Sequence, residues 1–313
     1  MKVLVTCPPM LGLFDEFRSD FEAAGLEGIP AAVTQVMTED ELVSVLPGHD
    51  GWIIGDDPAS RRVFEAGKSG RLKAAVKWGV GTDNVDFGAC GDLGIPVTNT
   101  PGVFGREVAD VAMCYVLGLA RHTFEIDRGI RNDMAWPKPA GISLWDKTAA
   151  VIGFGDIGRA TARRLLAADL KVIAYDPFFQ PAGGLDVEAA AWPERLGEAD
   201  FLIFTCPLTP ETQHMFNAEI LDRLKPGVRV VNVSRGPVIE EAALVSGLAS
   251  GLVHSAALDV FEDEPLASDN PLRRFPNTIF GSHNGSNTVD AVRHVSRLAI
   301  SKIAGFLSAP QDT

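Results

Sequence analysis

The sequence predicts an α/β protein made of two Rossmann-like, doubly wound parallel-sheet domains, of which the terminal domain is discontinuous. Three observations predict this class. The length of 313 residues suits about two domains. Short β-branched runs alternate with turns and amphipathic stretches, as in parallel strands joined by crossover helices. A glycine-rich turn at residues 153–158 follows one such run and precedes a helical pattern.

Four apolar runs in the first hundred residues predict strands at 2–5, 51–54, 74–78 and 96–99, with helices at 14–24 and 60–70 between them. This set is too small to close a core by itself. The carboxyl-terminal stretch 289–307 has apolar residues at helical spacing, so we expect this helix to return to the first set. The predicted domains are therefore residues 1–98 with 288–313, and residues 99–287.

The second domain is predicted to begin with one long helix and to continue as a full sheet. From Gly105 to about Met134, apolar residues recur at near-helical spacing without a proline, which predicts a single helix that bridges the domains. Six apolar runs separated by helical patterns then predict a complete doubly wound sheet. These runs lie at 148–152, 171–175, 201–205, 228–233, 255–260 and 278–282.

Composition and charge exclude several classes of protein. With 46% hydrophobic and 22% charged residues, the chain is neither disordered nor collagen-like. A formal net charge of -13 repels phosphate backbones and anionic lipids, so we expect no nucleic acid and no membrane partner. The four cysteines are far apart and form no zinc-type spacing, which predicts reduced thiols and no metal site. The first apolar run is too short for a signal peptide, so the predicted location is cytoplasmic.

The glycine-rich turn predicts a dinucleotide site. In this pattern Gly153 permits a tight turn, Gly155 lets a pyrophosphate approach the backbone, and Gly158 lets helix and strand pack closely. The amino terminus of the following helix supplies N–H groups for the phosphates. Asp176, 18 residues after Gly158, ends the next strand and is placed to accept hydrogen bonds from the adenosine ribose. Its carboxylate repels a 2'-phosphate, which favours NAD over NADP. The alternative is a tight turn that binds nothing.

Three consecutive predicted strands end in side chains suited to chemistry. Arg235 follows one, the acidic run 262–264 follows the next, and His283 follows the third. Because ligands bind beyond the carboxyl ends of such strands, we expect these groups to converge. An imidazole can protonate an alkoxide formed by hydride transfer to a 2-keto acid, and a guanidinium can grip its carboxylate and carbonyl. Arg235 could instead be a surface arginine and His283 a turn histidine, and spacing does not say which carboxylate faces the imidazole.

Six segments in the same order along nearly the whole chain carry a specific resemblance. They are residues 79–86 (GVGTDNVD), 99–102 (NTPG), the glycine run with Asp176, 233–236 (VSRG), 258–265 (LDVFEDEP) and 282–285 (SHNG). They resemble the D-isomer-specific 2-hydroxyacid dehydrogenase family, near its phosphoglycerate dehydrogenase and hydroxypyruvate reductase branches. The resemblance implies an NAD-dependent oxidoreductase that interconverts a small D-2-hydroxy acid and its 2-keto acid. It also implies a homodimer, a substrate-binding flavodoxin-like terminal domain and a central NAD-binding domain.

The resemblance gives roles to individual residues. Arg235, Glu264 and His283 take the catalytic roles. Backbone N–H groups at Val80 and Gly81 are expected to hold the substrate carboxylate, together with Arg235 and His283. The residues expected to bind the cofactor are Gly153, Gly155, Asp156, Ile157, Gly158, Asp176, Cys206, Pro207, Thr212, Val233, Ser234, Arg235, Asp259, His283 and Gly285.

The sequence departs from the family pattern at three positions and leaves two rival functions open. Ser282 stands where proline is frequent, Asn284 where an apolar residue is usual, and Asp146 where glycine is common. A formate dehydrogenase has glutamine at the carboxylate position, so Glu264 argues against that rival. An NAD(H)-sensing corepressor of the same fold is the second rival. Lys77 and Trp78 either line the pocket or, for Lys77, face solvent; the remaining histidines are expected to be structural or solvated: His49, His122, His214, His254 and His294.

Overall fold

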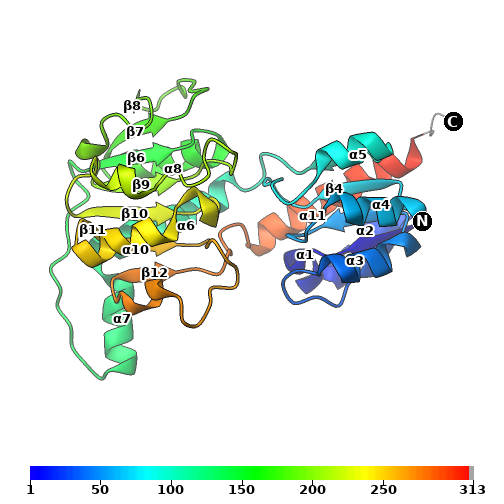
Figure 1. Cartoon of the computed structure of the whole chain (residues 1–313), viewed down its shortest axis with the longest axis horizontal. Coiled ribbons are helices and arrows are strands. Elements are labelled where there is room, and N and C mark those ends of the chain that lie inside the picture. The colour runs from blue at the N-terminus through cyan, green and yellow to red at the C-terminus, as the bar shows by residue number, and fades with distance from the viewer. Residues whose placement is uncertain (310–313) are drawn as a thin grey trace. The chain divides into compact units, whose positions relative to one another are not determined.

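The computed structural model describes residues 1–309, which form two compact α/β units (Figure 1). One unit comprises Met1–Phe104 and the segment from Asn287 onward, and the other comprises Gly105–Ser286. The predicted fold class is confirmed, including the discontinuous terminal unit. The predicted boundary after residue 98 falls inside a strand, since Thr98 and Asn99 still pair with the first sheet.

The first unit has a five-stranded parallel sheet in the order β2-β1-β3-β4-β5. Its strands are β1 (Lys2–Val5), β2 (Glu27–Pro30), β3 (Gly51–Ile54), β4 (Ala74–Lys77) and β5 (Val97–Asn99). Its helices are α1 (Pro8–Gly12), α2 (Arg18–Ala23), α3 (Glu39–Val45), α4 (Arg61–Ser69), α5 (Phe87–Leu93) and α11 (Val289–Ser308). Short 3-10 turns cover Phe14–Phe17 and Leu46–Gly48.

The carboxyl-terminal helix α11 packs on β3 and β4, as predicted. A side chain at Gly51 would meet Ile303 at 3.1 Å, and the Trp78 indole N–H donates to Ser296 Oγ at 3.1 Å. The edge strand β2 was not predicted because its sequence EGIP has a single β-branched residue, Ile29, among residues that are depleted in strands. The predicted helix 14–24 is split into a 3-10 turn and α2.

The second unit has a seven-stranded parallel sheet in the order β12-β11-β10-β9-β6-β7-β8. Its strands are β6 (Thr148–Ile152), β7 (Lys171–Tyr175), β8 (Val187–Ala189), β9 (Phe201–Phe204), β10 (Val228–Asn232), β11 (Val253–Leu258) and β12 (Thr278–Phe280). Apart from the two helices within residues 105–132, which are described below, its helices are α8 (Asp156–Ala167), α9 (Ala218–Leu221) and α10 (Glu241–Ser250). Short 3-10 turns cover Leu196–Glu198, Gly236–Val238 and Pro271–Arg274. The six predicted strands are present, and the edge strand β8 is too short to be read from the sequence.

The predicted long helix from Gly105 to Met134 is wrong, because the chain breaks it at His122. α6 (Gly105–Arg121) ends there and α7 (Thr123–Asn132) begins, with His122 in the left-handed region at φ 56°. The His122 ring contacts the His254 ring at 5.9 Å, and its Nδ1 lies 2.9 Å from a Glu125 carboxylate oxygen. These side-chain contacts accompany a backbone turn that apolar periodicity does not report. α6 lies wholly in the second unit, against α8 and β10–β12.

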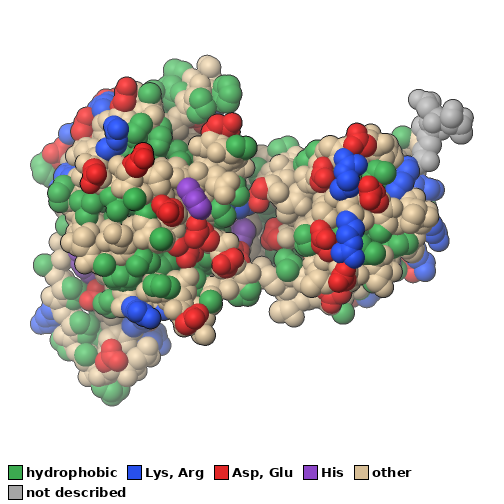
Figure 2. All heavy atoms as spheres, viewed as in Figure 1, with side chains coloured by type: hydrophobic (Ala, Val, Ile, Leu, Met, Phe, Trp, Pro, Cys, Tyr) green, Lys and Arg blue, Asp and Glu red, His purple; other side chains and the backbone are tan. Residues whose placement is uncertain are grey.

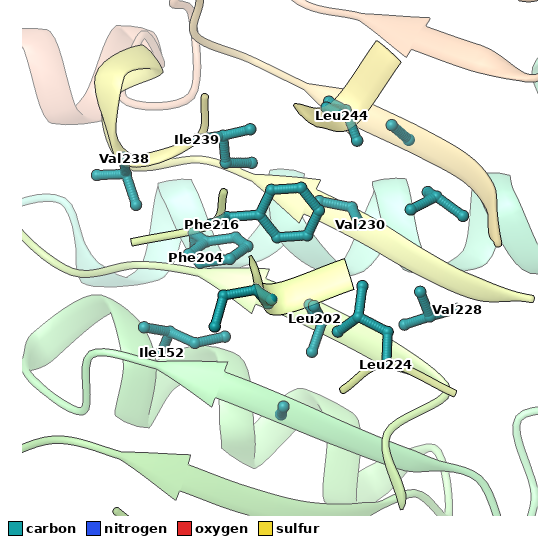
Figure 3. Packing of buried hydrophobic residues seen from close by; sticks show 14 of the residues in the cluster. Ile152, Leu202, Phe204, Phe216, Leu224, Val228, Val230, Val238, Ile239 and Leu244 are labelled. Carbon is teal, nitrogen blue, oxygen red and sulfur yellow. The ribbon is translucent and has the colours of Figure 1, made fainter. Parts of the chain in front are cut away.

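Aromatic and aliphatic side chains fill the core of the second unit between the sheet and its covering segments (Figure 3). The rings of Phe204 and Phe216 meet at right angles with centroids 6.1 Å apart. Both side chains are fully buried, as is Val230 of the neighbouring strand. Burial of such side chains stabilises by about 1.5–3 kcal/mol each, so this layer fixes the strand ends that carry the site.

Candidate active site

The candidate catalytic side chains lie just beyond three neighbouring strands. β10, β11 and β12 are in parallel register, with Asn232 beside Leu258 and Leu258 beside Phe280. Arg235, Glu264 and His283 therefore follow the same edge of the sheet within a few residues. This is the edge at which open parallel sheets bind ligands.

The turn that carries Arg235 is held by Asn232, the last residue of β10. Asn232 Oδ1 accepts hydrogen bonds from the backbone N–H of Ser234 at 3.0 Å and from its hydroxyl at 2.7 Å. Asn232 Nδ2 donates to the Arg235 carbonyl at 2.9 Å. A side chain at Gly236 would collide with the backbone of Phe261 and Glu262, so the arginine turn packs directly on the acidic segment. Sequence reasoning missed Asn232, although an asparagine that ends a buried apolar strand is a usable signal.

The structure brings Glu264 and His283 together. His283 Nδ1 lies 2.8 Å from Glu264 Oε2, and the second carboxylate oxygen of Glu264 accepts the Phe261 N–H at 2.9 Å. Both side chains are about a quarter exposed, at 25% for His283 and 26% for Glu264. Among the three acidic residues that spacing left open, Glu264, which the resemblance selected, is therefore the one placed against the imidazole. Because a carboxylate only accepts, the Nδ1 that faces Glu264 carries a proton.

Asp259 holds the loop that carries His283 through hydrogen bonds to its backbone. This buried carboxylate accepts the Gly285 N–H at 2.8 Å, the Asn284 N–H at 3.3 Å and the Tyr115 hydroxyl at 3.3 Å. The His283 N–H donates to the Asp259 carbonyl at 2.6 Å, and His283 itself is left-handed at φ 55°. Burial, followed by the charge of Asp259, raises the pKa of Tyr115. Contact of Asp259 with the cofactor stays a prediction, and the supporting Tyr115 was not predicted as a site residue.

The glycine run has the local geometry that a pyrophosphate requires. Gly153 is at φ 91°, and a side chain there would meet the backbone of Cys206 at 2.6 Å. A side chain at Gly158 would collide with the Gly153 carbonyl, so this position allows α8 to pack on the strand end. At Gly155 a side chain would meet no atom of residues 1–309 within 4 Å, which leaves the approach open. Gly155 also caps α8, whose first turn, with Asp156 and Ile157, presents N–H groups without intrahelical partners.

Asp176, at the end of β7, is hydrogen-bonded to the glycine turn. Its carboxylate accepts the Phe154 N–H at 2.7 Å and the Phe178 N–H at 2.8 Å, which ties the end of β7 to the turn. A carboxylate has about four acceptor sites, so these bonds leave capacity for ribose hydroxyls. The residues present therefore fit NAD, and they disfavour a 2'-phosphate through the charge of Asp176.

The loop after β9 lies next to the glycine run, at the point where the strand order reverses between β6 and β9. Thr212 Oγ1 donates to the Pro207 carbonyl at 2.7 Å and accepts the Thr209 N–H at 2.8 Å, which orders this loop. Burial raises the pKa of the Cys206 thiol to about 12, so this cysteine is not a nucleophile. The Val233 and Ser234 side chains are buried, and contact of all these residues with a cofactor stays a prediction.

The first unit carries the other expected substrate residues in the loop after β4. Val80 is 40% exposed, and its carbonyl accepts a hydrogen bond from Asn99 Nδ2 at 2.9 Å. Two residues before Gly81, Gly79 is at φ 119° and donates its N–H to Thr100 Oγ1 at 2.7 Å. Lys77 does not face solvent, because its ammonium is buried and pairs with Asp56 at 2.8 Å.

Comparison with known proteins agrees with this geometry. Residues 113–285 match the family model described as D-isomer specific 2-hydroxyacid dehydrogenase, NAD binding domain. The chain belongs to this family. It is 37% identical over 272 residues to a hydroxypyruvate reductase from Thermotoga maritima, covering 85% of this chain and 88% of that protein. It is 32% identical to a D-3-phosphoglycerate dehydrogenase from Archaeoglobus fulgidus, covering 98% of this chain but 57% of that protein. The TT0316 protein from Thermus thermophilus superimposes with a TM-score of 0.86 at 31% identity, covering 98% and 97% of the two chains.

Membership in the 2-hydroxyacid dehydrogenase family makes the chain an NAD-dependent oxidoreductase. All four cysteines are free thiols. Across residues 1–309, no cluster of three or more His, Cys, Asp or Glu side chains is arranged to bind a metal ion. Among the same residues, no helix has the length and apolar character needed to cross a membrane.

Proposed function

We propose that this dehydrogenase reduces a small, unbranched 2-keto acid to the D-2-hydroxy acid, and catalyses the reverse reaction, with His283 as the acid and base. The observation that carries the proposal is the 2.8 Å contact between His283 Nδ1 and Glu264 Oε2 at the ends of adjacent strands. When bound, NADH would supply the hydride that the carbonyl carbon of the substrate receives. His283 Nε2 then gives a proton to the carbonyl oxygen, and the Glu264 carboxylate stabilises the imidazolium that precedes this step.

Arg235 is proposed to bind the substrate carboxylate and polarise its carbonyl. The planar guanidinium fork matches both oxygens, and the Asn232 and Gly236 contacts hold its turn against the Glu264 segment. Val80 and Gly81 are proposed to bind substrate through their backbone N–H groups, and the first unit is proposed to be the substrate-binding domain. Among the family's substrates, hydroxypyruvate and glyoxylate carry no second anionic group. We favour them because Lys77, the cation nearest this loop in sequence, is already neutralised by Asp56.

The test is NADH oxidation with a panel of 2-keto acids, comparing the native protein with His283→Ala. We expect turnover with glyoxylate or hydroxypyruvate and a loss of about 10²-fold or more in kcat for the variant, with NADH binding retained. His294→Ala, at an exposed position of α11, is the matched control and should keep full turnover. Near-native kcat in His283→Ala would remove the imidazole from the mechanism.

Two other functions are separated by the same experiment. Formate oxidation uses no acid or base, so activity with formate that survives His283→Ala would favour a formate dehydrogenase. A sensor that binds NADH without reducing any keto acid would be the corepressor type. Glu264 in hydrogen-bond contact with His283 favours the 2-hydroxyacid reaction over formate oxidation, and turnover of a keto acid separates the enzyme from the sensor.

We also propose a homodimer built on the second unit, located in the cytoplasm. Three large apolar side chains are exposed in and after α7, with Met134 at 88%, Trp136 at 76% and Ile130 at 41%. Apolar surface of this kind is typical of an interface. Light scattering after size exclusion should give twice the chain mass for the native protein and a smaller mass for Trp136→Ser. A native monomer would contradict this.

A further inference from the structure

One histidine outside the predicted site, His214, contacts two segments that carry expected catalytic residues. It lies in the loop between β9 and α9, which also contains Cys206, Pro207 and Thr212. Its Nε2 lies 2.7 Å from Glu262 Oε1, two residues before Glu264. Its backbone N–H donates to the Pro237 carbonyl at 2.7 Å, two residues after Arg235. On the face that Figure 2 shows, acidic and histidine side chains lie close together on this unit.

The backbone of the Glu264 segment is already held by other groups. Glu241, at the start of α10, accepts the Glu262 N–H at 2.9 Å, and its second oxygen accepts Asn270 Nδ2 at 2.9 Å. The Phe261 N–H donates to Glu264 itself. The Glu262 side chain is therefore an additional connection, made not within its own segment but to the β9–α9 loop.

The position of His214 is fixed, while its contact with Glu262 stays accessible. His214 is left-handed at φ 50°, and Asn217 Nδ2 donates to its carbonyl at 3.1 Å. The His214 and Glu262 side chains are 43% and 31% exposed. Contacts between polar side chains exposed to this degree contribute little to the stability of a fold. A contact that joins three functional segments and adds little stability is better explained by alignment of the site.

We propose that His214 is a positioning residue for the reaction. Its pair with Glu262 aligns the segment that carries Glu264 with the β9–α9 loop, so that Glu264 meets His283 in the geometry needed for proton transfer. This inference rests on the proposed function. Because the β9–α9 loop is also expected to contact NAD, cofactor binding and the alignment of Glu264 are linked, and the linkage acts equally in both directions.

The test is a double-variant cycle with His214→Gln, Glu262→Gln and the two combined. We expect each single variant to lower kcat for keto-acid reduction about 10-fold, since a small misplacement of a catalytic group is costly. The keto-acid KM should change by less than about 2-fold. The combined variant should be no slower than the singles, because both remove the same contact. His214→Lys, whose ammonium can also donate to Glu262, should recover part of the loss, and His294→Gln is the control.

A second measurement does not depend on turnover. NADH titration by fluorescence should show weaker binding in His214→Gln and Glu262→Gln by about 2- to 5-fold, with equal urea midpoints for all variants. Additive losses of kcat in the combined variant, or losses that follow a fall in the folded fraction, would overturn the positioning role. Normal kcat in these variants with a slow His283→Ala would overturn this inference alone. Normal kcat in His283→Ala would instead overturn the proposed function.

Discussion

Both parallel sheets carry charged side chains at the carboxyl ends of their strands, but these side chains differ in solvent exposure and in their partners. At the carboxyl end of the second sheet, Glu264 and His283 are a quarter exposed and face each other. At the carboxyl end of the first sheet, Lys77 is 3% exposed, pairs with Asp56 and donates a hydrogen bond to the Gly55 carbonyl. The same fold therefore supports an accessible pair suited to proton transfer in one unit and an internally satisfied cluster in the other.

The buried carboxylate of Asp57, which follows β3 of the first sheet, has its hydrogen-bond partners within the chain. Its carboxylate accepts the Met37 N–H at 2.8 Å, the Gly55 N–H at 3.1 Å and the Thr6 hydroxyl. The Thr6 oxygen in turn accepts the Trp52 indole N–H at 3.0 Å. A buried carboxylate that meets only donors from its own chain stabilises the loops around it, whereas a reacting group must keep an atom for the substrate.

The largest expected effect is at the accessible edge. Arg235→Lys keeps the charge but loses the planar fork, so we expect kcat/KM for the keto acid to fall by about 10²-fold or more. Arg223→Lys, at an exposed position of the same unit, should stay within about 2-fold of the native value. Steady-state assays with NADH decide this, and a loss below about 5-fold would mean that a point charge suffices at this position.

The matching change at the buried edge should affect stability and not chemistry. In Asp57→Asn, one amide NH₂ faces N–H or O–H donors, so we expect the free energy of unfolding to fall by about 1–3 kcal/mol. Urea unfolding measures this loss, and kcat well below the melting temperature should change by less than about 2-fold. A large loss of kcat with native stability would show that Asp57 belongs to the chemistry, and the contrast between the two edges would fail.

The same carboxylate predicts a pH dependence at the acid end. Burial raises the pKa of Asp57 and outweighs the hydrogen bonds that lower it. The folded state then binds more protons than the unfolded chain just above the ordinary carboxyl pKa of about 3.9. This residue's contribution to the free energy of unfolding therefore decreases as the pH rises through that window. Asp57→Asn should remove this component, which urea unfolding between pH 4 and 6 would detect.

Much of this contrast could be read from the sequence, but the contacts could not. Strand ends and glycine spacing located Arg235, His283 and the cofactor turn, because apolar periodicity and local conformation are sequence-local. The pairing of Glu264 with His283 was implied only by the family resemblance, and the support of Asp259 by Tyr115 joins residues far apart in the chain. Asp146 is a departure from the family pattern that only the structure explains. It occupies the left-handed region at φ 60°, which explains a common glycine there, and pairs with Lys171 at 2.6 Å.

Cofactor choice sharpens the comparison at the glycine turn. Asp176→Ser removes the charge that repels a 2'-phosphate, while its hydroxyl can still accept one N–H bond. We expect the ratio of kcat/KM for NADH over NADPH to fall by about 10-fold or more, mostly through weaker NADH binding and improved NADPH binding. The exposed Asp222→Ser should leave the ratio unchanged. An unchanged ratio in Asp176→Ser would place cofactor discrimination elsewhere.

The smallest effect is expected at the opposite, amino-terminal end of the second sheet, where His254 titrates without contributing to the reaction. Burial, followed by the charges of Arg229 and His122, lowers the pKa of His254, and Glu125 opposes this only partly. Below the ordinary imidazole pKa of about 6.5, the unfolded chain therefore binds a proton that the folded chain does not. The free energy of unfolding should fall with decreasing pH there, by at most about 1.4 kcal/mol per pH unit from this group.

His254→Gln should flatten the dependence of the unfolding free energy on pH between 6.5 and 5, and the exposed His294→Gln should not. Urea unfolding at several pH values measures both, and kcat of His254→Gln at pH 7.5 should match the native value. If His254→Gln instead lowered kcat, the amino-terminal end of the sheet would be coupled to the site. His254 would then affect the reaction as well as the stability of the fold.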